Sequence, residues 1–133
     1  MLLAGLAVSA CTSQTQLEET PYQRQFFLSE NYQAVFVRSL SQMKECFLVM
    51  NGNINVDGQI YNELGYGEIT NSVSTLTYSP YNMIRIESSG SGANVKLKSL
   101  TLVKNASLDW MEYWAKGGQR CATMGFNERP PAL

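Results

Sequence analysis

The spacing of apolar residues predicts a helix in the first half of the chain. From Ser29 onward, apolar positions recur at intervals of three and four, as one face of an amphipathic helix requires. These positions are Tyr32, Val35, Phe36, Leu40 and Met43. Ser29 or Asn31 can cap the N-terminus of this helix, and the pattern ends near Cys46.

A second helical pattern lies near the C-terminus. Ser107 is placed to cap it, Asp109 to interact with the positive end of its dipole, and Gly117-Gly118 to end it. We expect its large apolar side chains to pack against the core. They are Leu108, Trp110, Met111, Tyr113 and Trp114.

Between the two helices the pattern becomes strand-like. An apolar run at residues 47–50 and alternation at Ile54 and Val56 predict strands, with Asp57-Gly58 as a hairpin turn. Further strands are expected at residues 60–66, 68–76, 83–87 and 95–102, separated by residues 79–82 and 88–92. Four charged residues of the last two strands are expected to face water. They are Arg85, Glu87, Lys96 and Lys98.

The order of these elements predicts a single α+β domain over residues 29–125. We expect a meandering antiparallel sheet of about five strands, with the N-terminal and the C-terminal helix packed on one face. This architecture resembles helix-grip and TATA-binding-protein-like (TBP-like) domains, which occur in some outer-membrane assembly lipoproteins. The resemblance concerns the fold and carries no function. Residues 126–133, with Pro130-Pro131, are expected to form a disordered tail.

The N-terminal residues Leu6-Ala7-Val8-Ser9-Ala10-Cys11 form an apolar run that ends in small residues and a cysteine. Val8-Ser9-Ala10-Cys11 resembles the lipobox of bacterial lipoprotein precursors. The resemblance implies that residues 1–10 are a signal peptide, that Cys11 carries a diacylglycerol and an acyl chain such as palmitate, and that residues 11–28 are a flexible tether. The alternative is a buried apolar helix with a free cysteine. The run is too short to span a bilayer, which takes about 20 apolar residues.

The chain contains three cysteines, and lipidation of Cys11 would leave Cys46 and Cys121 as a pair. Disulfides form in oxidising compartments, of which the bacterial periplasm is one. A bridge between Cys46 and Cys121 would close a long loop, which stabilises the fold by about 4 kcal/mol in the chain-entropy model. The alternative is two unpaired buried thiols.

Composition removes several classes of function. Ten basic residues balance eleven acidic ones with no run of either sign, so the sequence predicts no basic face for nucleic acid. The chain has no histidine, which excludes Ser-His-Asp and Cys-His mechanisms and the commonest zinc ligand. With its cysteines lipidated and bridged, no thiolate remains. We therefore expect no catalytic residue, no metal and no cofactor.

Two acidic patterns are interpreted as structural. Glu63 and Glu68 would cleave a glycoside only if they shared a cleft, and solvent-facing residues beside a Gly-rich bend explain them more simply. Residues 53–58 resemble the start of a calcium loop, but the position that requires glutamate is Leu64.

Three tyrosines are candidates for contact with a partner. Tyr66, Tyr78 and Tyr81 lie in or beside expected loops, where tyrosine is a common anchor of protein interfaces.

Taken together, these features predict a small non-enzymatic lipoprotein, anchored by its lipid in the outer membrane and facing the periplasm. In such lipoproteins an aspartate after the lipidated cysteine favours inner-membrane retention, and here that residue is Thr12. We expect a component or accessory of an envelope assembly of the secretion, transport or barrel-assembly type, with an envelope protein as partner. The alternatives are a periplasmic inhibitor or small-ligand binder, and a carboxylate-dependent glycan hydrolase.

Overall fold

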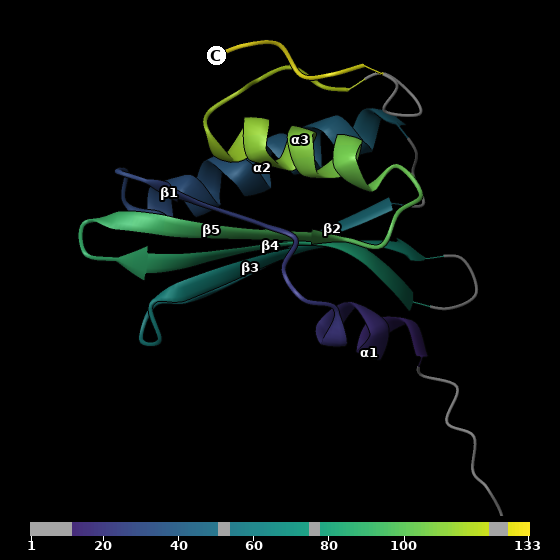
Figure 1. Cartoon of the computed structure of the whole chain (residues 1–133), viewed down its shortest axis with the longest axis horizontal. Helices are drawn as coiled ribbons and strands as arrows, with labels where there is room; N and C mark the ends of the chain where they lie inside the picture. Colours follow the sequence, from purple (N-terminus) through teal and green to yellow (C-terminus); the bar gives the residue numbers. More distant parts are fainter. Residues whose placement is uncertain (1–11, 51–53, 75–77, 123–127) are drawn as a thin grey trace, which may run out of the picture.

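Five antiparallel strands form an open sheet in the computed structural model, which describes residues 12–50, 54–74, 78–122 and 128–133. Three helices complete an α+β fold (Figure 1). The elements are α1 Thr12–Glu19, β1 Arg24–Leu28, α2 Tyr32–Met50, β2 Ile54–Tyr61, β3 Tyr66–Ser74, β4 Tyr78–Ser89, β5 Gly92–Ser99 and α3 Lys104–Ala115.

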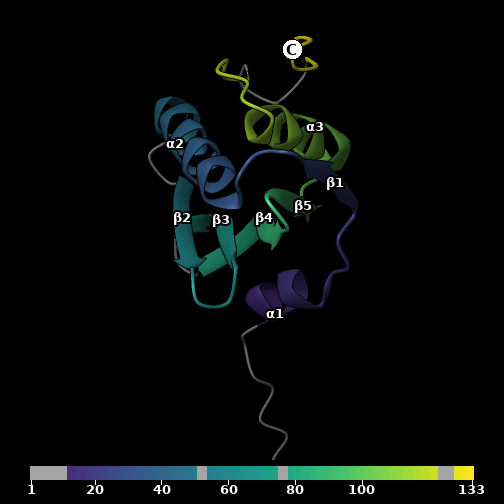
Figure 2. The ribbon, with the colours of Figure 1, turned by 90° about the vertical axis from the view of Figure 1, so that its left-hand side faces the viewer.

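The strand order is β1-β5-β4-β3-β2, so β2 to β5 form a meander and β1 lies beside β5 at the far edge. The connection from β1 through α2 therefore crosses from one edge of the sheet to the other. Helices α2 and α3 cover one face, as predicted, and α1 lies on the opposite face (Figure 2). We call these the helix face and the open face of the sheet.

The core lies between the helix face and the two helices that cover it. Strand residues Ile69, Ile84, Ile86, Val95 and Leu97 are fully buried there. Burying one large apolar side chain stabilises the fold by about 1.5–3 kcal/mol. This layer is therefore the main source of stability. The predicted core residues of α3 are also buried, and the rings of its neighbouring aromatic residues are inclined to one another. The ring centroids of Trp110 and Trp114 lie 5.8 Å apart.

Helix α2 begins where Asn31 caps it. The side-chain Oδ1 of Asn31 accepts a hydrogen bond of 2.8 Å from the backbone N–H of Gln33. The helix continues past Cys46 to Met50, so the strand predicted at residues 47–50 is wrong. Cys46 and Phe47 are buried at a helical spacing from Met43, and a short apolar run alone does not distinguish a strand from a helical face.

The predicted hairpin turn at Asp57-Gly58 is also wrong. Both residues lie inside β2, all of which pairs with β3. The turn follows Tyr61 and includes Gly65, whose φ of 74° favours glycine.

Strand β4 differs from its prediction at one end and agrees at the other. Residues 79–82, expected to separate two strands, lie in β4 opposite an irregularity between Asn71 and Ser72. The predicted turn in residues 88–92 is confirmed, and Gly90 has a φ of 60° there.

Helix α3 begins at Lys104, so Ser107 is not its N-cap. Ser107 is buried within the helix, and its hydroxyl lies 3.0 Å from that of Thr101. The predicted stop is confirmed: the Gly117 N–H donates to the Trp114 carbonyl and the Gly118 N–H to the Tyr113 carbonyl, at 3.0 and 2.8 Å. This is the usual pattern of a helix that ends in glycine.

Both ends of the folded part extend beyond residues 29–125. Residues 12–28, expected to be a tether, contain α1 and β1, because β5 offers an edge to which β1 can pair. Residues 128–133, expected to be disordered, lie along α3, and the Trp110 indole N–H donates a 3.0 Å hydrogen bond to the Glu128 carbonyl. Among the helices in the described part of the chain, none is long and apolar enough to cross a membrane.

Candidate functional site

The open face carries a row of charged residues across three strands. Register places Glu68 of β3 opposite Arg85 of β4, and Arg85 opposite Lys96 of β5. Arg85 contacts Glu68 at 2.9 Å and Glu87 at 3.2 Å, and Lys96 contacts Glu87 at 2.6 Å. Each charge therefore faces at least one of opposite sign. The hydrogen bond from Lys96, followed by that from Arg85, holds the pKa of the Glu87 carboxyl below its usual value.

Two tyrosines extend this row toward the edge of the sheet. The Arg85 guanidinium lies 3.8 Å from the centre of the Tyr66 ring, and the ring centroids of Tyr66 and Tyr61 are 5.1 Å apart. Tyr61 is 43 % exposed, so the outer ring of this aromatic pair is open to a partner. Of these three residues only Tyr66 is a contact candidate from the sequence, because strand register alone brings Tyr61 and Arg85 to it.

The other two candidate tyrosines do not join this cluster. Tyr81 lies in β4, next to the pair Asn82 and Asn71, whereas Tyr66 pairs with Glu87 near the other end of the same ladder. Burial raises the pKa of the Tyr81 hydroxyl, and the nearby Asn71 amide partly offsets this rise. The Asn71 amide makes no regular hydrogen bond within the described part of the chain. The side chain of Tyr78 lies outside the described residues.

Helix α1 is held on the open face by one apolar residue and one buried cation. Leu17 is 1 % exposed, and Lys98, expected to face water, is only 4 % exposed. The Lys98 Nζ donates to the carbonyls of Glu18 and Thr20 at 3.4 and 3.2 Å, near the C-terminal end of α1 where a cation is favourable. Burial lowers the pKa of Lys98.

A pocket of about 230 Å³ lies between α1 and strands β2 to β4. Its walls combine three carboxylates with apolar and aromatic groups. The lining residues are Leu17, Glu18, Asp57, Gln59, Tyr61, Glu68, Thr70, Pro80 and Met83. Glu63 does not line this pocket and lies exposed in the turn after β2, so Glu63 and Glu68 do not share this cleft.

No calcium loop is present at Asp57, which lies in a regular strand, while Asn53 is outside the described residues. Within the described ranges, no group of three His, Cys, Asp or Glu side chains could hold a metal ion.

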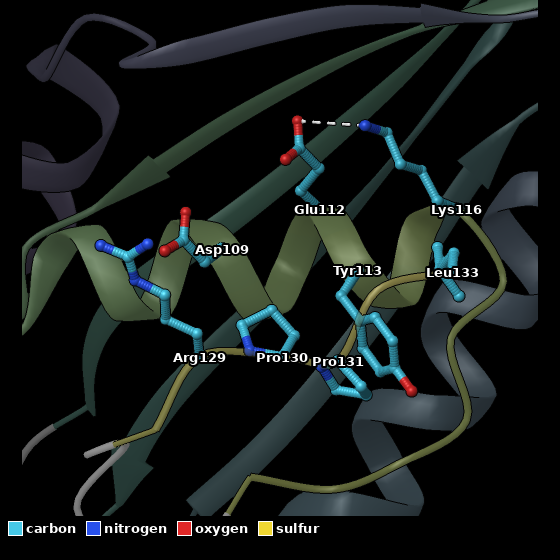
Figure 3. A pocket seen from close by; sticks show the side chains of 8 residues that line it. All are labelled: Asp109, Glu112, Tyr113, Lys116, Arg129, Pro130, Pro131 and Leu133. Carbon is cyan, nitrogen blue, oxygen red and sulfur yellow. Dashed lines mark ion pairs between the residues drawn. The ribbon is translucent and has the colours of Figure 1, made fainter.

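Two further pockets lie on the side of the helices. One, of about 290 Å³, lies between α3 and the C-terminal segment; Figure 3 shows Arg129 beside Asp109 of the helix, while Glu112 points toward Lys116. The other, of about 300 Å³, lies between α2 and β2. It is lined by Lys44, Phe47, Ile54, Asn55 and Val56.

The predicted disulfide between Cys46 and Cys121 is present, with a Cα–Cα distance of 5.1 Å. It joins α2 to the segment that follows α3. Polar contacts hold the same segment: the Trp114 indole donates to the Arg120 carbonyl at 2.8 Å, and the Gln42 amide to the Gln119 carbonyl at 2.9 Å.

The predicted lipidation residue, Cys11, lies outside the described residues, immediately before α1.

Comparison of the chain with protein-family models, with curated proteins and with solved structures finds no match.

Proposed function

We propose that this protein is a small lipoprotein of a Gram-negative envelope, anchored through Cys11 and acting by contact with another envelope protein. The disulfide between Cys46 and Cys121 carries this proposal, because such a bridge persists in an oxidising compartment such as the periplasm. The lipobox-like residues Val8-Ser9-Ala10-Cys11 support membrane attachment, and Thr12 favours the outer membrane.

The proposed architecture is of the helix-grip or TBP-like type. A strand, a helix, four strands and a final helix follow one another after α1, and both later helices cover the same face. This order supports a sheet held under two helices. It carries no function by itself.

The proposed contact surface is the exposed part of the open face around Tyr61, Tyr66 and Arg85. Tyrosine and arginine are enriched at the energetic centres of protein interfaces, and here the cation lies directly on an aromatic ring. The charged row also offers complementarity that can orient a partner. The surface supports binding as a component or accessory of an envelope assembly.

The helix face offers less support for a small apolar ligand. In the described part of the chain, the aromatic residues of α3 fill the layer between that helix and the sheet. The pockets on this side lie at the edge of that layer or outside it. We therefore favour a protein partner over a ligand enclosed between sheet and helices.

Intact-mass analysis of the protein purified from its native membrane fraction, with and without reduction, tests location. We expect a chain that begins at Cys11, carries acyl chains and gains two hydrogens on reduction. A soluble, unlipidated chain that still contains Met1 would overturn the anchor and the proposed location.

Photo-cross-linking in cells tests the contact surface. A cross-linking amino acid replaces Tyr61 in one strain and Val37, an exposed residue on α2, in a control strain. We expect a discrete membrane-protein adduct from position 61 that is absent from position 37. Adducts of equal yield from both positions, or from neither, would contradict a partner on the open face.

A further inference from the structure

Strand β2 ends the sheet with an unprotected edge. It is the last strand in the order, and its residues Ile54–Tyr61 pair without interruption on the β3 side. No other segment in the described residues pairs with its outer side. The strand contains no proline, lysine or arginine, and its ladder with β3 has no bulge. Native proteins commonly use these features to block an edge, and their absence leaves backbone N–H and C=O groups free to pair with another strand.

The edge lies beside a partly apolar groove. The side chains of Ile54 and Val56 point to the helix face but are only half-buried, because α2 does not cover them completely. Together with Phe47, Lys44 and Asn55, they line the pocket of about 300 Å³ between α2 and β2. A strand added to β2 would direct every second side chain into this groove and would bury apolar area that the isolated chain leaves half-exposed.

The opposite side of the same edge is acidic. Asp57, in the middle of β2, is exposed and makes no ion pair within the described part of the chain. It also lines the pocket on the open face, together with Glu18 and Glu68. The side chains of an added strand that do not enter the groove would lie on this face, where a basic residue complements Asp57.

We propose that the outer edge of β2 binds an extended segment of a partner protein by strand addition. The segment alternates apolar residues, which enter the groove beside Val56, with polar residues that include a lysine or arginine facing Asp57. Backbone hydrogen bonds contribute affinity, and the groove and the carboxylate contribute specificity. This mode of binding does not depend on the lipid anchor.

Peptide selection against the full chain carrying Cys11→Ser tests the proposal. The probe is a display library of random nine-residue peptides, and the enriched peptides are synthesised for binding measurements. We expect them to alternate apolar and polar residues, to include a basic residue, and to protect the backbone amides of residues 54–61 from hydrogen exchange. The amides of β1, the other edge strand, serve as the internal comparison.

Substitution of the groove provides a matched pair of variants. Val56→Lys places a charge in the groove, whereas Val37→Lys places the same charge on a solvent-exposed position of α2. We expect peptide affinity to fall about tenfold or more for Val56→Lys and to be unchanged for Val37→Lys. Asp57→Lys leaves the groove intact and should weaken basic peptides by about two- to fivefold.

The outcomes separate this proposal from its alternatives. Failure to enrich any peptide, protection confined to another surface, or equal affinity for the Val56→Lys and Val37→Lys chains would overturn it. A dimer in sedimentation experiments that protects residues 54–61 would show that a second copy occupies the edge, and would also overturn it. If Val56→Lys does not fold, amide protection and the Asp57→Lys chain still decide the question. None of these results depends on whether Cys11 is lipidated.

Discussion

Glu87 shows how single residues on the open face depend on their neighbours. Its carboxylate lies between Lys96 and Arg85, and both hydrogen bonds lower its pKa. A carboxyl whose pKa is lower in the folded than in the unfolded state stabilises the fold above its unfolded pKa. This stabilisation is lost as the pH falls through the folded pKa.

Lys96→Gln should raise the pKa of Glu87 more than Arg85→Gln does, because the hydrogen bond from Lys96 contributes most to the shift. Carboxyl chemical shifts followed by NMR from pH 7 to pH 2 measure both effects. The cost in stability at neutral pH should be small, about 0.5–1 kcal/mol, since these side chains are partly exposed. A larger rise with Arg85→Gln would contradict the assigned order of the two contacts.

Asn31 and Ser29 offer a second prediction at this scale, because both were candidate caps and only Asn31 bonds to the first turn of α2. Asn31→Ala should lower the free energy of unfolding by about 1 kcal/mol, as loss of an N-cap does. Ser29→Ala is the matched control and should change it little. Urea denaturation of both variants gives the comparison, and equal losses would rule out the cap.

At the scale of elements, two glycines allow α2 to lie close to the sheet. A Cβ on Gly67 would lie 2.6 Å from the ring of Phe36, which is buried, and a Cβ on Gly58 would lie 2.7 Å from a methyl group of Leu40. Such approaches are shorter than contacts between carbon atoms allow. The closeness of the helix thus depends on missing side chains in β2 and β3.

Gly67→Ala should destabilise the protein by about 1–3 kcal/mol, because the Phe36 ring is enclosed and cannot move without disturbing the core. Gly58→Ala should cost less, since the ends of the half-buried Leu40 side chain can turn away. Thermal unfolding of the two variants tests this ranking. The reverse ranking would mean that Leu40, and not Phe36, limits the approach of α2.

The packing of α1 on the sheet also belongs to the scale of elements, and the hydrogen bonds from Lys98 hold this helix in place. Lys98→Met keeps the apolar stem but removes the donor to the Glu18 and Thr20 carbonyls. We expect the amides of residues 16–20 to exchange about tenfold faster or more, while the core strands keep their protection. Lys96→Met is the control, because Lys96 does not contact α1. Unchanged exchange in Lys98→Met would show that Leu17 alone holds the helix.

At the scale of the whole molecule, the disulfide links the middle of the chain to the segment after its last helix. The two joined residues are 75 positions apart, so most of the sheet lies within the closed loop. A bridge of this span mainly restricts the unfolded chain. It can therefore stabilise every element that it encloses.

Replacing both cysteines, in the chain Cys46→Ser and Cys121→Ser, should lower the free energy of unfolding by about 2–4 kcal/mol. Cys11→Ser should leave it unchanged, because Cys11 is not part of the bridge. Urea denaturation with and without a reducing agent measures both. If the reducing agent destabilised the double variant as much as the native chain, its effect would not come from the bridge.

The sequence by itself determined the features that depend on local pattern and composition. Amphipathic spacing located α2 and α3, Gly117 marked the end of a helix, and the absence of histidine excluded two classes of catalysis. The pairing of Cys46 with Cys121, which the structure contains, was predicted from the lipobox resemblance, because that resemblance sets Cys11 aside. The two helices could be predicted because neighbouring residues carry the information that specifies them.

Only the tertiary structure decided the features that depend on distant partners. Residues 24–28 have no strong strand pattern, yet they pair with β5, and Gly58 lies in a strand because it pairs with Ile69 of β3. The cluster of Tyr61, Tyr66 and Arg85 exists only in the correct register. The free edge of β2 is visible only when the strand order is known. The physical reason is the same in each case, since pairing and packing between residues far apart in sequence override local preference.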